Sequence, residues 1–312
     1  MKPERSKAVL LSKRANVFYL EHARVIQKDD RVVYLTESGE DIEKFFNIPE
    51  KNTAFILLGR GTSVSDQAAR KLAAAGVMLG FAGSGGSPLH SAMEPVFFSG
   101  QSEYRPTEYM QEWYRLWQDD DRRLLAGKQL LLKRIEWVLD AWDVNPELSK
   151  KNVAIPDALV SRFKARIKAS GSATDLLSAE ADWAHGLYAL LKVGYKLDFK
   201  REEGVGKRGN AGEVTNSYLD HGNYLAYGYA AVTLNTLGVA FAFPLLHGKT
   251  RRGALVFDIA DLFKDAIVMP LAFEYASKGK KDNELRAAVI DACYTGKVLD
   301  KLFESIKALL AS

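Results

Sequence analysis

Cysteine is almost absent from this 312-residue chain, which contains only Cys293. A single thiol cannot form an internal disulfide framework, and it excludes a zinc site built from several cysteines. Scarce cysteine is also typical of proteins in a reducing compartment, so we expect the chain in the cytoplasm. The N-terminal stretch "MKPERSKAVLLSKRANVFYL" lacks an uninterrupted apolar segment, and the sequence therefore predicts no secretory signal.

Long uncharged segments are also scarce, with one exception. The stretch 223–246, "NYLAYGYAAVTLNTLGVAFAFPLL", contains no charged residue, and roughly 20 apolar residues are enough to span a bilayer. Its polar side chains, together with Gly238 and Pro244, favour a different interpretation. We expect a buried core helix that ends near Gly238 and is followed by a second element.

Neither sign of charge dominates, and no internal repeat is present. Lys and Arg number 43 against 39 Asp and Glu, which gives a net charge of +4 and a pI of about 8.9. This mildly basic balance is compatible with an anionic partner without establishing one. The length allows two domains, and a hydrophobic content of 47% allows a sizeable core.

The first 90 or so residues are rich in strand-like patterns. Two runs, Asn16–Ile26 and Arg31–Thr36, flank a polar turn and predict a hairpin. Further strands are predicted at Thr53–Leu58 and Val77–Gly83. Between them, Ser63 and Asp66 have the spacing of a capping box and predict the start of a helix.

The pattern becomes helical after a loop rich in Gly, Ser and Pro at Gly83–Pro95. We therefore expect an α+β fold: a small N-terminal β-rich domain (1–90), a linker (91–106) and a larger all-α domain (107–312). The helical pattern begins near residue 107, and the further predicted helices are Pro156–Ser170, Ala173–Tyr195, Glu213–Leu237, Ala254–Tyr275, Asn283–Thr295 and Lys297–Leu310.

Three polar motifs carry little functional information. The glycine-rich stretches "LLGRGTS" and "GSGGSP" lack the complete phosphate-binding signatures, so tight turns explain them best. Asp119, Asp120 and Asp121 are adjacent, and adjacent helical residues point in different directions. A solvated face or a helix cap is therefore favoured there over a metal site.

The segment "LLHGKTRRGALVFDIADLF" is more informative, because it places Asp258 and Asp261 within an apolar run. On a helix these residues share a face, which Asp265 extends. His247 lies upstream, and Lys249, Arg251 and Arg252 follow it. Carboxylates with a histidine are typical ligands of a divalent metal, Mg²⁺ or Mn²⁺ rather than zinc, and the basic residues suit a phosphate-bearing substrate. From this segment alone, arginine pairing of the aspartates explains the pattern equally well.

Glu180 shifts the balance towards a metal site. It replaces an apolar residue in a helical stripe that includes Leu176, Trp183 and Leu187, and Glu is rarely buried without a partner. Glu180, His247 and one aspartate could therefore form a site from separate elements. His185 and His221 are alternatives for the histidine. We rank His247 first, because the basic residues and the carboxylate helix adjoin it.

These motifs resemble the CRISPR-associated integrase of the adaptation module ("Cas one"), and the stretch "GRGTSVSDQAARKLAAAGVMLGFAGSGGSP" resembles its subtype I-F version. The resemblance covers nearly the whole chain. Its motifs are "LLSAEADWA", "NSYLDHGNYLAYGYA" and "PLLHGKTRRGALVFDIADLF". It implies that Glu180, His247 and Asp261 bind a metal, with Asp258 as a further active-site aspartate.

The resemblance also implies a reaction and partners. Such a protein joins the 3′-hydroxyl ends of a captured DNA fragment to the CRISPR repeat during spacer acquisition. It is implied to be a homodimer that acts on double-stranded DNA. Its expected partner is a second adaptation subunit, which in subtype I-F is fused to a helicase-nuclease. Two alternatives remain: a non-catalytic DNA-binding scaffold, and a metal hydrolase acting on a small phosphorylated molecule.

The residues themselves predict metal-assisted phosphoryl transfer. Asp258 would orient the site or bind the metal occasionally. His247 must be neutral to bind a metal, so activity is expected to fall below about pH 6. Phosphate contacts are expected from a set of basic residues, although about half of the set could instead be ordinary surface charge: Lys249, Arg251, Arg252, Lys200, Arg201, Lys207 and Arg208.

Overall fold

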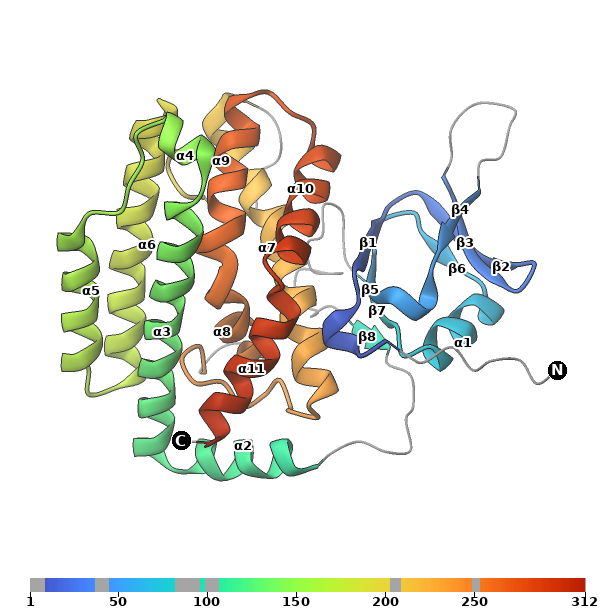
Figure 1. Ribbon diagram of the computed structural model, residues 1–312, viewed down its shortest axis with the longest axis horizontal. Coiled ribbons are helices and arrows are strands. Elements are labelled where there is room, and N and C mark those ends of the chain that lie inside the picture. Colours follow the sequence, from blue (N-terminus) through green and yellow to red (C-terminus); the bar gives the residue numbers. More distant parts are fainter. Residues whose placement is uncertain are drawn as a thin grey trace. The chain divides into compact units, whose positions relative to one another are not determined.

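A computed structural model of the chain describes residues 9–36, 45–81, 96–98, 107–202, 209–248 and 253–311. The chain divides into two compact units, Met1–Arg105 and Pro106–Ser312 (Figure 1). The first consists mainly of strands and the second of helices. This arrangement confirms the predicted α+β fold with a small N-terminal β-rich domain.

The N-terminal unit contains two four-stranded sheets. In the first, with strand order β1-β5-β7-β8, β5 pairs in parallel with β1 and β7, and β8 is antiparallel to β7. In the second, with order β4-β3-β2-β6, β2, β3 and β4 are antiparallel neighbours and β6 is parallel to β2. The bounds are β1 Asn16–Leu20, β2 Ala23–Lys28, β3 Arg31–Thr36, β4 Phe45–Ile48, β5 Thr53–Leu58, β6 Ser63–Val64, β7 Met78–Phe81 and β8 Val96–Phe98.

Helix α1 (Asp66–Ala74) packs beside this second sheet. Its residues Ala68 and Leu72 join a buried cluster that also contains Val25, Val32 and Ile56. This cluster draws apolar side chains from both sheets, so it forms the core of the N-terminal unit. Two short 3₁₀-helices, Leu11–Lys13 and Glu50–Asn52, precede β1 and β5.

The predicted strand Asn16–Ile26 is wrong as a single element. It divides into β1 and β2, which lie in different sheets. His22, between them, has a φ of +48°, and a non-glycine residue with this backbone conformation interrupts an extended strand. The hairpin is instead formed by β2 and β3, and its turn residues Asp29 and Asp30 also have positive φ.

Two further details of this unit differ from the sequence predictions. The side chain of Ser65, not Ser63, caps α1 by accepting a hydrogen bond from the Ala68 amide. Ser63 lies in strand β6. Val96–Phe98, which fall within the predicted linker, form strand β8.

The second unit begins with α2 (Glu108–Gln118) and α3 (Asp120–Asp143), separated by Asp119. The Asp119 side chain accepts hydrogen bonds from the amides of Asp121 and Arg122, so the aspartate triplet contains a helix cap, as predicted. The remaining helices are α4 Pro146–Lys150, α5 Asp157–Ala169, α6 Ala173–Tyr195, α7 Ala211–Thr236, α8 Ala254–Phe263, α9 Met269–Ser277, α10 Asp282–Thr295 and α11 Val298–Ala311.

The predicted helix Ala254–Tyr275 is interrupted. A π-helical turn, Lys264–Val268, separates α8 from α9. Such a turn contains more residues than a turn of α-helix, so it changes the direction of the side chains within it. Asp265 therefore does not simply extend the face shared by Asp258 and Asp261.

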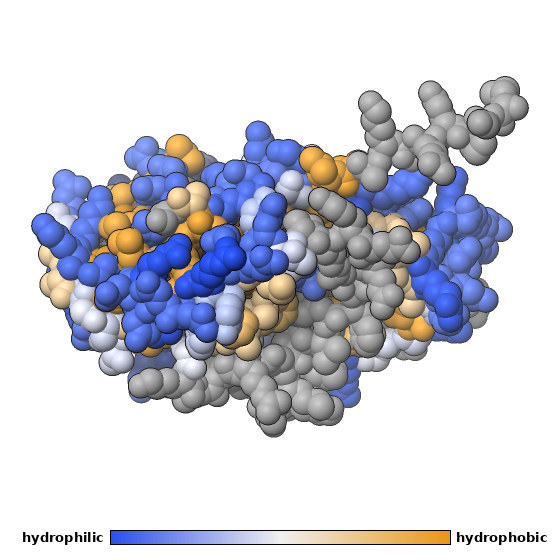
Figure 2. Space-filling view, turned by 90° about the horizontal axis from the view of Figure 1, so that it is seen from below, coloured by the Kyte–Doolittle hydropathy of each residue, from blue (hydrophilic) through white to orange (hydrophobic). Residues whose placement is uncertain are grey.

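Helix α7 is buried along most of its length, and it packs against α8, α9, α10 and α11. It ends at Thr236, close to the predicted end near Gly238, which has a φ of +72°. Among the described residues, no helix is long and apolar enough to cross a membrane. Among the coloured residues of Figure 2, which is seen from below the orientation of Figure 1, hydrophilic ones predominate and apolar ones lie in groups between them.

We predict that Gly212→Ala destabilises the protein. A Cβ at this position in the first turn of α7 would lie 1.9 Å from the carbonyl oxygen of Asp198. Replacing helical glycine by alanine usually gains about 1 kcal/mol. Overpacking against backbone costs about 1–3 kcal/mol, so we expect a net loss. Gly171→Ala is the control, because its Cβ would meet only Asp175 Oδ2 at 3.9 Å. Urea unfolding should show a lower midpoint for Gly212→Ala alone, and equal midpoints would contradict the clash.

Candidate metal centre

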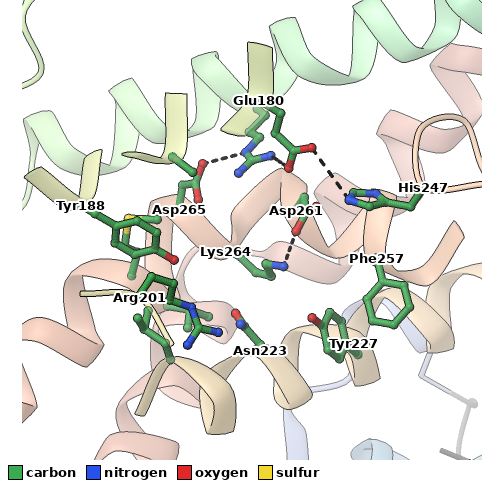
Figure 3. A pocket seen from close by; sticks show the side chains of 15 residues that line it. Glu180, Tyr188, Arg201, Asn223, Tyr227, His247, Phe257, Asp261, Lys264 and Asp265 are labelled. Carbon is green, nitrogen blue, oxygen red and sulfur yellow. Dashed lines mark hydrogen bonds and ion pairs between the residues drawn. The ribbon is translucent and has the colours of Figure 1, made fainter. Parts of the chain in front are cut away.

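Three potential metal ligands converge from separate elements of the helical unit. Glu180 lies on α6, His247 on the loop before α8, and Asp261 on α8. One ligand atom from each can be chosen so that all three lie within 4.8 Å of one another. His247 Nε2 is 3.9 Å from Glu180 Oε2, and Asp261 lies between these residues and Lys264 (Figure 3).

Glu180 occupies the helical stripe as predicted, and only 13% of its side chain is exposed. The stripe is otherwise apolar, with Leu176, Trp183 and Leu187 buried on the same helix. The negative charge of Glu180 is paired with Arg134 of α3, whose Nη1 donates a hydrogen bond to Glu180 Oε1 at 2.5 Å. The other carboxylate oxygen, Oε2, faces His247.

Arg134 also binds Asp265, to whose Oδ2 its Nε donates at 2.7 Å. The indole of Trp183 donates to the same oxygen, and the indole of Trp142 donates to the Asp265 carbonyl. Both hydrogen bonds to the Asp265 side chain are thus accepted by one oxygen, Oδ2. Arg134 was not predicted as a site residue, although it falls on the buried face of α3 beside Leu130, Leu131 and Ile135.

Asp258 holds the loop that carries His247. Its Oδ2 accepts hydrogen bonds from the amides of Leu245 and Leu246, at 2.6 and 3.0 Å. Its Oδ1 lies 3.2 Å from the His247 amide and 2.6 Å from His247 Nδ1. Because this contact assigns the imidazole proton to Nδ1, it leaves the Nε2 lone pair directed at Glu180 and Asp261.

Asp261 is buried, and its carboxylate forms an ion pair with the ammonium group of Lys264, one turn further along. Within the described residues, Asp261 Oδ1 has no hydrogen-bond partner of good geometry. Burial raises the pKa of Asp261, but the charges of Lys264, Arg134 and His247 outweigh burial and hold this pKa below its ordinary value. The carboxylate is therefore available as an anionic ligand.

The pKa values of the other two candidate ligands, Glu180 and His247, are also shifted. Burial raises the pKa of Glu180, and the charges of Arg134 and His247 offset this only in part. Burial lowers the pKa of His247, but its hydrogen bond with Asp258 and the nearby carboxylates outweigh burial, so this pKa lies above its ordinary value. The raised pKa of His247 reflects a surplus of negative charge at the site, whereas burial is the main cause of the raised pKa of Glu180.

This surplus fits a divalent cation. Four carboxylates lie in or beside the cluster, those of Glu180, Asp258, Asp261 and Asp265, while Arg134 and Lys264 contribute two positive charges. With His247 neutral, two negative charges remain uncompensated in a largely buried site, where isolated charges are costly. The oxygen-rich donor set favours Mg²⁺ or Mn²⁺.

A cavity of about 200 Å³ adjoins the three ligands. Polar side chains from α6, α7 and the residues after α6 line it, in addition to Lys264 (Figure 3): Tyr188, Arg201, Asn223 and Tyr227. Of these, the sequence analysis identified only Arg201. A tyrosine or an asparagine on a helix gives no signal of its own, because its contribution depends on which helices become neighbours.

The alternative histidines are not at the cluster. His185 is exposed, and His221 forms an ion pair with Asp282 of α10. Among the predicted phosphate-binding residues, the Lys200 side chain is 88% exposed. Arg201 is instead half-buried and donates hydrogen bonds to Asn216 and Asp220. The other five lie outside the described residues: Lys207, Arg208, Lys249, Arg251 and Arg252.

We predict that Arg134→Met destabilises the protein by about 3–5 kcal/mol, because it leaves buried carboxylates without their partner. Arg166→Met is the matched control, since Arg166 pairs with Asp182 at the surface, where an ion pair contributes only about 0–1 kcal/mol. The free energy of unfolding, measured in urea at pH 7.5, should separate the two variants. Similar losses in both would mean that the buried pairs contribute no more than surface ones.

Known proteins resemble this chain along nearly its whole length. Residues 17–297 match the family described as "CRISPR associated protein Cas1". The chain is 42% identical to the CRISPR-associated endonuclease Cas1 of Pectobacterium atrosepticum, over 98% of this chain and 95% of the relative.

Solved structures share the fold. A CAS1 protein from Thermotoga maritima superimposes with a TM-score of 0.72 at 15% identity, covering 94% of this chain and 95% of that one. A casposase bound to its integration product gives a TM-score of 0.71 at 13% identity, covering 95% and 90%. The family match spans both units of this chain and includes every residue of the candidate metal centre. The chain therefore belongs to the Cas1 family of CRISPR-associated proteins.

Proposed function

We propose that Glu180, His247 and Asp261 bind a divalent cation, Mg²⁺ or Mn²⁺, and form the catalytic centre at which this DNA endonuclease and integrase acts in spacer acquisition. The observation that carries the proposal is the convergence of these three ligands within 4.8 Å beside a polar cavity. The bound ion would supply Lewis acidity at the scissile phosphate.

The protein residues have distinct roles in this proposal. Glu180 and Asp261 supply anionic oxygens, and His247 supplies Nε2. Asp258 holds the imidazole from its other side, through Nδ1. Arg134 holds one oxygen of Glu180, which leaves the second free for the ion. In the joining reaction, a 3′-hydroxyl oxygen forms a bond to the repeat phosphorus. The bond from that phosphorus to the repeat's own 3′-oxygen breaks. The attacking hydroxyl loses its proton, and the departing 3′-oxygen takes up a proton to become a hydroxyl group.

Lys264 would stabilise the reacting phosphate in addition to pairing with Asp261. Its ammonium lies in the cavity wall, 5.2 Å from the Tyr227 ring centroid. Burial lowers the pKa of Lys264, but Asp261 outweighs this effect and keeps the pKa above its ordinary value, so the group remains charged. A fixed positive charge beside the cavity suits an anionic substrate.

Double-stranded DNA is the proposed substrate, both as the captured fragment and as the CRISPR repeat. The casposase with the same fold is bound to an integration product. Lys200 is proposed to contact phosphate from the surface. Phosphate contacts are also proposed for Lys207, Arg208, Lys249, Arg251 and Arg252. Arg201 is proposed to act from the cavity wall, where Asp220 holds it. We further propose a homodimer of subtype I-F that assembles with a second adaptation subunit fused to a helicase-nuclease.

We predict that Glu180→Ala and Asp261→Ala each abolish Mn²⁺ binding and the metal-dependent nicking and joining of branched DNA. Asp258→Ala should weaken Mn²⁺ binding by about 10–100-fold without abolishing it, because Asp258 orients a ligand and does not supply one. Isothermal titration with Mn²⁺, and a gel assay on labelled branched DNA, measure the two properties.

The surface variant Asp182→Ala is the control for these three substitutions, since Asp182 lies on the same helix as Glu180 and is half-exposed. Nicking that survives both ligand substitutions would exclude this site. DNA binding without metal-dependent turnover in the parent would favour a scaffold role. Equal Mn²⁺ affinities for the Asp258 and Asp261 variants would overturn the division of roles between them.

We predict that, as the pH is lowered, Mn²⁺ affinity starts to fall at a higher pH than it would for a histidine ligand with an ordinary pKa. A proton and the metal compete for His247 Nε2, so affinity decreases about tenfold per pH unit below the pKa of the metal-free imidazole. This pKa lies above the usual value of ~6.5, because of Asp258 and the other carboxylates. The expected onset therefore lies above the value near pH 6 inferred from the sequence.

Asp258→Asn tests the cause of this shift. Removing the carboxylate charge should lower the pKa of His247 and move the fall in Mn²⁺ affinity to lower pH, even though affinity at pH 8 is reduced. The measurement is a series of Mn²⁺ titrations between pH 5 and 8.5. An affinity independent of pH over this range would mean that His247 is not a ligand.

A further inference from the structure

The loop that carries His247 is held by hydrogen bonds along two different parts of its backbone. We call residues Phe243–Gly248 the His247 loop. Asp258 binds three successive amides of this loop, those of Leu245, Leu246 and His247. The carbonyl groups just before these amides are bound by a different element, helix α2.

Two indoles of α2 supply these bonds. Trp113 Nε1 donates to the Phe243 carbonyl at 3.0 Å, and Trp117 Nε1 donates to the Pro244 carbonyl at 2.9 Å. The two tryptophans are four residues apart, so they lie on one face of α2 one turn apart. They therefore bind successive carbonyls of a segment that lies about 130 residues further along the chain.

The tryptophans are fixed in turn. Trp113 is 1% exposed. The Trp117 ring packs against the Phe243 ring, with centroids 4.9 Å apart, and the guanidinium of Arg123 lies 5.3 Å from the Trp117 ring. Arg123 also donates to the Trp117 carbonyl. Both indoles are thus held by contacts with neighbouring residues.

Packing supports the same loop from α3. A Cβ at Gly127 would lie 3.0 Å from Leu246 Cδ2, so the absence of a side chain at Gly127 lets Leu246 lie close to the helix. Pro244 has no amide proton and a restricted φ. At this residue the carbonyl is therefore the backbone group that can anchor the loop by hydrogen bonding, and Trp117 binds it.

These contacts determine where His247 lies. The indoles hold the carbonyl groups of Phe243 and Pro244, and Asp258 holds the amides of the three residues that follow. Little backbone freedom then remains before the imidazole. A metal ligand must be placed within a few tenths of an ångström, because the bonds to Mg²⁺ or Mn²⁺ are short, at about 2.0–2.2 Å.

We propose that Trp113 and Trp117 are positioning residues for the metal ligand His247, acting through the Phe243 and Pro244 carbonyls. This inference rests on the proposed metal centre, and it adds α2 to the elements on which the centre depends. Neither indole touches the ligand atoms. Their effect is on the position of the imidazole and hence on metal affinity.

The test uses Trp113→Phe and Trp117→Phe in the full-length chain. Phenylalanine keeps an aromatic ring but removes the N–H donor, which leaves a loop carbonyl without its partner. The control is Tyr114→Phe, on the same helix. Tyr114 also packs against the Phe243 ring, but its hydroxyl contacts Gln118 and not the loop.

Two readouts are measured on each variant. The first is Mn²⁺ affinity by titration calorimetry, where we expect the dissociation constant to rise about fivefold in each tryptophan variant, less than for loss of a residue that touches the ligand. The second is amide hydrogen exchange of the His247 loop without metal, which should be faster at Leu246 and His247. Turnover at saturating Mn²⁺ should return close to the parent value, and Tyr114→Phe should match the parent throughout.

Unchanged Mn²⁺ affinity in both variants overturns the proposal, and so does faster exchange without loss of affinity. In the second case the indoles would stabilise the loop without determining the position of the His247 imidazole. If Trp113→Phe does not fold, as judged by circular dichroism, the partly exposed Trp117 carries the test. Failure of the parent itself to bind Mn²⁺ would refute the metal centre, a result that is visible without any tryptophan variant.

Discussion

Arg134 places one buried positive charge between two carboxylates, Glu180 and Asp265, which belong to different elements. Through these contacts α3 is tied both to α6 and to the π-helical turn after α8. Each pair uses one carboxylate oxygen: Oδ2 of Asp265, to which Trp183 also donates, and Oε1 of Glu180, whose Oε2 faces His247. A buried ion pair contributes little to stability compared with apolar packing, but it specifies geometry strongly. Here it determines which carboxylate oxygens face the cavity.

Near Arg134, side chains of the same type have different roles because their neighbours differ. Asp258, Asp261 and Asp265 are closely spaced carboxylates in one segment, but each has different partners. Asp258 accepts from backbone amides and contacts the His247 imidazole. Asp261 pairs with Lys264, and Asp265 binds Arg134 and the Trp183 indole. Only Asp261 keeps an oxygen among the proposed ligands. Two of these carboxylates are thus held by hydrogen bonds, and the charge of the third, Asp261, is balanced by Lys264.

The sequence predicted the parts of this protein that depend on local pattern. The order of a β-rich unit followed by a helical unit, the bounds of α6 and the candidate ligands Glu180 and His247 follow from local pattern. The choice of Asp261 as the third candidate ligand came from the family resemblance, because the pattern itself did not distinguish Asp261 from Asp258. Predictions failed where a single backbone conformation decided the outcome, as at His22 and at the π-helical turn. Arg134, Tyr227 and the indoles of α2 were missed because their roles depend on contacts between distant segments, which no local pattern encodes.

The π-helical turn Lys264–Val268 has a consequence for how this segment can change in evolution. A π turn holds one residue more than an α turn and turns less per residue, so the extra residue is absorbed within the turn and α9 keeps nearly the rotational phase of a continuous helix. Loss of one residue here would convert the π turn to regular helix and leave α9 nearly in phase with α8. The residues of the turn itself would move, and Asp265 among them would lose its present alignment with Arg134 and Trp183. The length of this segment is therefore constrained by the buried contacts of Asp265 and not by the helix that follows.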